Sequence, residues 1–267
     1  MAELLYKLTN DILFKMMFVQ YPDLLKRLVA WLLGVRVEDI KDLAVKNPDI
    51  PPDDLGKKFC QLDINMLIDG KFIDLEIQVE DEGDYPERSV YYWSRIFSSG
   101  LPERGQYWEL PQTIVISIVA FTLFRCEEYY SEFRLLEVKR HEQLTDKMCM
   151  LYFELPKVPD IENADSELMY WLLLFRAKTE EDLTKIEEKG GPIMAQVIEA
   201  YRHIVASEEF KENERIRVRR QQDEASALGN ARRQNSIEIA KTMRAEGMDV
   251  DTVARITGLT VDDILRL

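Results

Sequence analysis

The chain has 267 residues, of which 46% are hydrophobic and 31% charged, and its formal net charge is −14. This length and composition suffice for a large buried core and exclude a disordered or collagen-like chain. The acidic total excludes a protein that coats nucleic acid through bulk positive charge, although it leaves room for a local basic groove.

The few cysteines and histidines limit the chemistry further. The three cysteines are widely spaced and form no CxxC pair, which predicts a reducing compartment without disulfides or a thiolate zinc site. The two histidines, His141 and His203, are too far apart to predict a histidine-rich metal site. The first residues lack a signal-peptide pattern, and the most apolar run, 113–124, is too short to cross a bilayer. We therefore expect a cytoplasmic protein without membrane contact, whose catalysis depends on carboxylates.

The N-terminal region is typical of two helices. Thr9 or Asn10 can cap a first helix that extends to Phe18. Apolar residues at helical spacing follow Pro22 and stop at Gly34, which predicts a second helix. A proline-containing loop comes next, around residues 48–52.

The middle of the chain alternates between strand and helix patterns. Strands are predicted over 59–68, 71–80, 112–121, 132–139 and 148–155. Helices are predicted over 85–100, 168–177, 180–188 and 192–208. The run 112–121 is rich in Ile and Val without alternation, which indicates a strand buried on both faces. The order of elements predicts an α/β protein with a mixed β-sheet flanked by helices and an α-helical C-terminal tail.

The composition changes near residue 208, where large apolar residues become rare. We expect a core over 1–207, a charged helical connector over 208–236 and a small helix-turn-helix-like element over 237–267. The arginines of the connector have acidic neighbours, which favours a solvent-exposed helix over a DNA-binding surface. Asp262 and Asp263 would repel phosphates. We therefore expect the last helices to serve packing or homo-oligomer formation rather than DNA binding.

The hairpin predicted around Asp69-Gly70 has one apolar and one polar face. A two-residue turn sets Ile68 opposite Lys71, and the same register places Asp63 directly opposite Glu76. Strand alternation then gathers acids and amides on one face. These polar residues are Gln61, Asp63, Asn65, Asp74, Glu76 and Gln78.

Two interpretations of this polar face remain open from the pattern alone. Directly opposed carboxylates repel, since their Cβ atoms lie only about 5 Å apart. A divalent cation such as Mg²⁺ or Mn²⁺ turns that repulsion into attraction and can activate water for attack on a phosphate ester. The solvated face of an ordinary antiparallel hairpin gives the same pattern without any metal.

Asp63 followed by Glu76-Ile77-Gln78 resembles the D…(D/E)xK core of the PD-(D/E)xK nuclease superfamily. It is more closely similar to the Rpn branch, the recombination-promoting nucleases and transposases in which ExQ stands in place of ExK. The stretches LTNDILFKMMF before the hairpin and RSVYYWSRIFSSGLPERGQYWELPQTIVISIVAF after it resemble the same branch in the same order. The resemblance implies a restriction-endonuclease-like fold and a metal-dependent DNA endonuclease with little sequence preference, linked to recombination or mobile elements.

The resemblance also implies roles for individual residues. Asp63 and Glu76 are implied as catalytic residues that bind Mg²⁺ or Mn²⁺, with Gln78 in the position of the usual lysine. An amide can hydrogen-bond but cannot balance transition-state charge. Another cation is therefore expected: Lys15 is one candidate for this catalytic role, and Arg88 and Arg95 are others. Asp11, on the same predicted helix as Lys15, is a candidate metal ligand, although it equally suits a helix N-terminus.

Arg88 and Arg95, on the helix that follows the hairpin, are candidates for contacts with DNA, the expected partner. Gln78 and the acidic total also favour an alternative function. In this alternative the chain is a binding or regulatory protein that keeps a catalytically degenerate nuclease fold.

Overall fold

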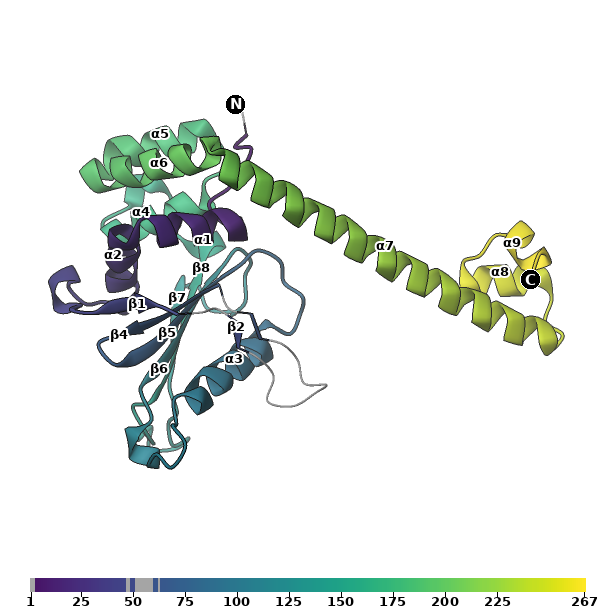
Figure 1. The fold of residues 1–267 in the computed structure, drawn as a ribbon, viewed down its shortest axis with the longest axis horizontal. Coiled ribbons are helices and arrows are strands. Elements are labelled where there is room, and N and C mark those ends of the chain that lie inside the picture. The colour runs from purple at the N-terminus through teal and green to yellow at the C-terminus, as the bar shows by residue number, and fades with distance from the viewer. Residues whose placement is uncertain (1–2, 47–48, 51–59, 62) are drawn as a thin grey trace. The chain divides into compact units, whose positions relative to one another are not determined.

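The computed structural model describes residues 3–46, 49–50, 60–61 and 63–267 (Figure 1). The chain forms two compact units, residues 1–210 and 211–267. The predicted loop prolines Pro48, Pro51 and Pro52 lie outside the described residues.

A mixed β-sheet lies at the centre of the first unit. The described residues form six strands in the order β1-β4-β5-β6-β8-β7. Their bounds are β1 Leu43–Val45, β4 Ile64–Ile68, β5 Lys71–Gln78, β6 Thr113–Val119, β7 Tyr130–Phe133 and β8 Met148–Glu154. β5, β6 and β8 run parallel, whereas β1, β4 and β7 pair antiparallel with their neighbours. The predicted mixed sheet is confirmed.

Helices and short turns surround this sheet. The helices of the first unit are α1 Asp11–Gln20, α2 Pro22–Leu33, α3 Tyr85–Ser99, α4 Glu167–Arg176, α5 Glu180–Lys189 and α6 Gly191–Ala206. The 3-10 turns are η1 Val37–Asp39, η2 Tyr107–Glu109, η3 Leu155–Lys157 and η4 Ile161–Asn163. The Asn10 side chain accepts a hydrogen bond from the Leu13 N–H and so caps α1, as predicted. α2 ends at Gly34 with a φ of 68°, which glycine adopts readily.

The two faces of the sheet pack against different helices. Figure 1 shows α1, α2 and α4–α6 on one side and α3 on the other. On the first side, β5 contributes Ile73, Leu75 and Ile77 to the main core, together with buried residues of α1, α2, α4 and α6. On the second side, Ile96 of α3 packs against Val115 of β6. Glu76 and Asp74, which alternate with the apolar residues of β5, therefore point toward the α3 side.

The hairpin register is confirmed up to the point where Asp63 is reached. β4 and β5 pair with Ile68 opposite Lys71 and Asn65 opposite Asp74. The predicted strand over 59–68 is wrong as one continuous strand, because β3 (Cys60–Gln61) pairs instead with β2 (Asp49–Ile50) in a separate two-stranded sheet. Gln61 therefore lies opposite Asp49 and not opposite Gln78.

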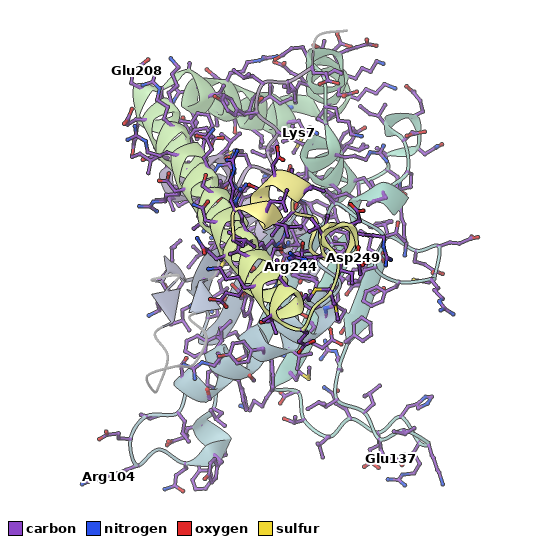
Figure 2. All side chains as sticks on the ribbon, turned by 90° about the vertical axis from the view of Figure 1, so that its right-hand side faces the viewer. Lys7, Arg104, Glu137, Glu208, Arg244 and Asp249 are labelled. Carbon is purple, nitrogen blue, oxygen red and sulfur yellow. The ribbon has the colours of Figure 1, made fainter. Side chains whose placement is uncertain are left out.

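The strand predicted over 132–139 is wrong in its position, since β7 ends at Phe133. The chain then turns back on itself: the Glu137 carboxylate accepts hydrogen bonds from the N–H groups of Lys139 and Arg140, and His141 has a φ of 57°. Figure 2 shows Glu137 in a loop that projects from the sheet. Local hydrogen bonding by this acid replaces the strand that the apolar residues indicated.

The second unit contains most of α7 (Glu208–Ala245), α8 (Val250–Thr257) and α9 (Val261–Leu265). A small core joins the end of α7 to α8 and α9 through buried residues that include Ala240, Val253 and Ile264. Gly258 ends α8 with a φ of 71°, the backbone conformation that the tight turn between the two short helices requires. No helix of the described ranges is both long and apolar enough to cross a membrane.

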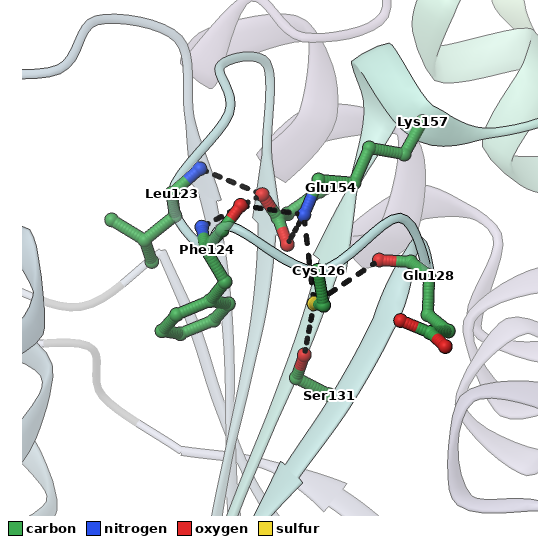
Figure 3. A network of polar contacts seen from close by, with 7 residues as sticks. All are labelled: Leu123, Phe124, Cys126, Glu128, Ser131, Glu154 and Lys157. Carbon is green, nitrogen blue, oxygen red and sulfur yellow. Dashed lines mark hydrogen bonds and ion pairs between the residues drawn. The ribbon is translucent and has the colours of Figure 1, made fainter.

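Glu154, at the end of β8, holds the loop that leaves β6 (Figure 3). Its Oε1 accepts hydrogen bonds from the N–H groups of Leu123 (2.6 Å) and Phe124 (3.1 Å). Lys157 Nζ donates to Glu154 Oε2 at 2.7 Å and to the Phe124 carbonyl oxygen at 2.9 Å. Glu154 is fully buried, and both carboxylate oxygens have partners within the chain.

Replacing this carboxylate by the amide in Glu154→Gln should lower the free energy of unfolding by about 1–3 kcal/mol, because the ammonium of Lys157 loses its anionic partner. Urea denaturation measures this change. Glu132→Gln is the matched control: Glu132 forms a more exposed ion pair with Arg134, so a loss below about 1 kcal/mol is expected. Equal losses in the two variants would contradict the assignment.

Candidate active site

Asp63 and Glu76 meet where the pairing of β4 with β5 ends. The Asp63 N–H donates a hydrogen bond to Glu76 Oε1 at 2.9 Å, and the Ile77 N–H donates to Asp63 Oδ2 at 2.9 Å. Carboxylate oxygens thus accept backbone hydrogen bonds that carbonyl groups would accept in a continuing strand pair. Because of this exchange, the strand pairing does not continue beyond Ile64, the first residue of β4, and both acids are fixed at the same place.

The two β5 acids on the polar face of the hairpin are buried, whereas Asp63, Asn65 and Gln78 are half-buried. Asp74 is 0% exposed and Glu76 6% exposed. Ser117 of β6 lies beside Glu76 in the parallel register, and Tyr85 of α3 donates a hydrogen bond to Ser117 Oγ at 2.8 Å. The solvated-hairpin interpretation is therefore wrong for Asp74 and Glu76, which lie on the side of the sheet that α3 covers.

Ser117 and Tyr85 are residues of the site that sequence reasoning missed. A single serine within the buried run TIVISIV was the available signal for Ser117, since a buried hydroxyl needs a partner. No comparable signal existed for Tyr85, which is the first residue of α3.

Burial and mutual repulsion make the charged forms of these carboxyl groups unfavourable. Burial, reinforced by the nearby Asp63, raises the pKa of Glu76 to about 8. Burial also raises the pKa of Asp74 well above its ordinary value, with Glu76 and Asp63 adding to the rise. The pKa of Asp63 is raised by burial as well, although the Lys15 ammonium opposes this rise. The site therefore favours an additional cation.

α1 brings a cation and a further acid to this cluster. Lys15 Nζ lies 3.3 Å from Asp63 Oδ1, and both side chains are less than one-third exposed. Asp11 lies one helical turn before Lys15 and adds to the burial-induced rise in the pKa of Asp63. The structure thus brings together Asp63, Glu76 and Lys15, with Asp11 close enough to act on Asp63 through its charge.

Of the other three candidate residues, Gln78 and Arg88 have polar partners outside the acidic cluster. Gln78 Nε2 donates to the Glu80 carbonyl oxygen at 3.0 Å. Arg88 Nη1 forms an ion pair with Glu82 Oε2 at 2.7 Å, and its guanidinium carbon lies 5.1 Å from the centre of the Tyr85 ring. Arg95 lies on α3, two turns beyond Arg88.

The carboxylate oxygens of the site are suitable ligands for a divalent metal ion, although they do not already surround a single position. Both oxygens of Asp74 are buried, and its carboxyl group lies against that of Glu76. Carboxylate oxygens are the ligands that Mg²⁺ and Mn²⁺ prefer. In the part of the chain that the structure describes, no three His, Cys, Asp or Glu side chains converge as a metal site, so ligation requires these side chains to close up.

Glu76→Gln should stabilise the metal-free protein at high pH. Folding raises the pKa of Glu76 from 4.5 to about 8, so the folded chain binds the proton more tightly and stability is lost as the pH rises between these values. This loss is at most about 1.4 kcal/mol per pH unit. Glutamine keeps an oxygen that can accept from the Asp63 N–H but removes the charge. Urea denaturation in chelator should show the variant gaining stability over the wild type from pH 5 to pH 9. A constant difference across this range would contradict it.

Comparison with protein families agrees with the geometry. A model of the PD-(D/E)XK nuclease family transposase matches residues 8–231. A model of the C-terminal HTH domain of the Rpn/YhgA-like nuclease family matches residues 233–267. Searches of curated proteins and of solved structures gave no match. The first model spans Lys15, Asp63, Glu76 and Gln78 as well as the whole sheet, and the chain therefore belongs to the PD-(D/E)XK nuclease family of Rpn-type transposases.

Proposed function

We propose that the chain is a metal-dependent DNA endonuclease that hydrolyses phosphodiester bonds with little sequence preference, in recombination or in the movement of mobile elements. The observation that carries this proposal is the pairing of Asp63 with Glu76 beside Lys15. Membership of the nuclease family supports it.

Asp63 and Glu76 would hold Mg²⁺ or Mn²⁺, with Asp11 as a further acid from α1. The bound ion would supply the chemistry of a Lewis acid, polarising the phosphate and lowering the pKa of water. The hydrogen bonds from the backbone to Asp63 and Glu76 fix the direction of their free lone pairs. The protein's contribution would thus be two acids oriented by backbone hydrogen bonds, which close up on the ion when it binds.

Lys15 takes the place of the lysine that is absent at position 78. Its ammonium group has three donors and a full charge, so it can hold the attacking water and balance charge in the transition state. α1 is fixed for this purpose, since Leu13, Phe14 and Met17 are fully buried in the main core. Gln78, at the end of β5, would orient the water by hydrogen bonding alone.

Arg88 and Arg95 of α3 would contact DNA phosphates on the first unit. We also propose that the C-terminal HTH domain binds DNA. In the sequence, the negative charge of Asp263 argues against DNA binding. In the structure, Arg233 Nη2 lies 3.1 Å from Asp263 and balances this charge, and Asp263 also accepts a hydrogen bond from Thr260 Oγ1. The exposed Val261 and Leu265 of α9 remain candidates for contacts between copies of the chain.

Purified protein with Mg²⁺ or Mn²⁺ should nick supercoiled plasmid DNA, and chelator should abolish the nicking. Asp63→Asn and Glu76→Gln should each reduce the rate at least about 100-fold, because each removes a charged ligand from the metal. Gel assays of plasmid relaxation measure these rates. Residual cutting that is equal in wild type and both variants would identify a contaminant and refute the proposal.

Lys15→Met should lower the nicking rate about 100-fold, because transition-state charge is then unbalanced. Lys15→Arg should recover part of the rate, since it restores the charge. Lys71→Met is the matched control: Lys71 is an exposed lysine at the opposite end of β5 from Gln78, and its loss should leave the rate within about twofold, an effect of overall charge alone. Equal loss in both methionine variants would show that Lys15 acts only through net charge.

One observation favours the second candidate, a binding protein with a degenerate nuclease fold. Gln78 donates its hydrogen bond to Glu80 and not toward the acids. This candidate requires DNA binding that is unchanged in Asp63→Asn and no metal-dependent cutting. The same assays, together with gel-shift measurements, separate the two functions.

A further inference from the structure

The edge strand β7 and the chain that follows it expose large apolar side chains. β7 is the last strand in the sheet that the described residues form. Its apolar residues and those just after it are each between 38% and 48% exposed: Tyr130, Phe133, Leu135 and Leu136. A strand edge of this kind is a template on which another chain pairs, and exposed apolar surface marks sites of interaction.

The backbone groups of this stretch alternate between the inside and the outside of the sheet. The Glu154 N–H donates to the Tyr129 carbonyl oxygen, and the Leu144 N–H donates to the Leu135 carbonyl oxygen. In antiparallel pairs, the residues between such positions direct their N–H and C=O groups away from the bonded strand. The residues whose backbone groups point outward are therefore Tyr130, Glu132, Arg134 and Leu136.

The charges on this edge select one register for pairing with a second copy of the chain. Antiparallel pairing across a two-fold axis requires that outward-pointing residues face each other. Setting Glu132 opposite Glu132, or Arg134 opposite Arg134, is repulsive. The register between these two sets Glu132 opposite Arg134 of the second copy, and the symmetry makes this attractive contact twice. The same register sets Tyr130 opposite Leu136 and Phe133 opposite its own copy.

We propose that two copies of the chain form a two-fold symmetric dimer through β7, so that their sheets join edge to edge. Phe133 lies on the axis, in a pair without backbone hydrogen bonds, where opposed side chains approach most closely. Glu132 already forms an ion pair with Arg134 of its own chain, and the second copy extends this pair into a network of charges. A second copy fits this edge because the charges and the apolar residues each complement themselves.

Sedimentation velocity of the full-length protein measures this assembly, and we expect a concentration-dependent dimer. Phe133→Asp places two carboxylates on the axis and should weaken the dimer at least about tenfold, because like charges across an interface repel. Val45→Asp is the matched control: Val45 is an exposed apolar residue of β1, at the opposite edge of the sheet, so its replacement should leave the dissociation constant unchanged. Equal weakening in both variants would contradict the proposal.

Charge reversal tests the register between two chains. Glu132→Arg and Arg134→Glu each set like charges opposite one another in a homodimer, so each variant alone should be monomeric where the wild type is dimeric. Mixed in equal amounts, the two variants should form a heterodimer, because every pair across the axis then joins unlike charges. Two variants with the circular dichroism of the wild type that fail to associate on mixing would overturn the register.

A disulfide tests the axis itself. Cys126 is exposed, so Cys126→Ser is the background. In this background, Phe133→Cys should form a covalent dimer on mild oxidation, because opposed residues of such a pair have Cα atoms about 4.5 Å apart. Leu135→Cys should not, because the register sets Leu135 opposite Ser131.

Two outcomes would overturn the dimer through β7. One is a wild type that stays monomeric over the concentration range measured. The other is a dimer that survives Phe133→Asp and is lost in Leu265→Asp, which would place the contact at α9, where Leu265 is exposed. These measurements use neither metal nor DNA, so their result is independent of the proposed function.

Discussion

The site depends on the exchange of hydrogen bonds between Asp63 and Glu76. Each carboxylate accepts a backbone N–H, from Ile77 and Asp63 respectively, and these bonds end the pairing of β4 with β5. The same two bonds give the acids their fixed positions. A continuous ladder would have satisfied the backbone but would have pointed the acids at each other without restraint. Strand termination and site formation are thus one event.

The surroundings of Asp74 and Glu76 explain the electrostatics of the site. The apolar residues of β5 enter the main core, and Asp74 and Glu76 are consequently turned toward α3. Tyr85 and Ser117 are neutral and hydrogen-bond each other, so they cannot compensate two buried acids. The ammonium of Lys15 is the cation that acts on the cluster through both hydrogen bonding and charge. The fold therefore makes the charged forms of these acids unfavourable, and strongly perturbed pKa values of this kind cluster at functional sites.

Much of this could be predicted from the sequence because it depends on local rules. The turn at Asp69-Gly70 and strict alternation fix the register that sets Asp63 near Glu76. Residues that act over long sequence separations could not be placed in this way. The contact of Lys15 with Asp63 needs α1 packed on the sheet, and the burial of Asp74 needs α3. Gln61 was misplaced because period-two patterning does not reveal that a side chain, and not a strand, pairs with Ile77.

The ion pair between Lys15 and Asp63 has a consequence for how the metal-free chain behaves. The ammonium of Lys15 already neutralises part of the charge of Asp63. It would therefore compete with a metal ion for this carboxylate. Under the proposed function, affinity for the ion and rate of hydrolysis would then depend in opposite directions on this one side chain, because Lys15 weakens ion binding and yet balances charge in the transition state.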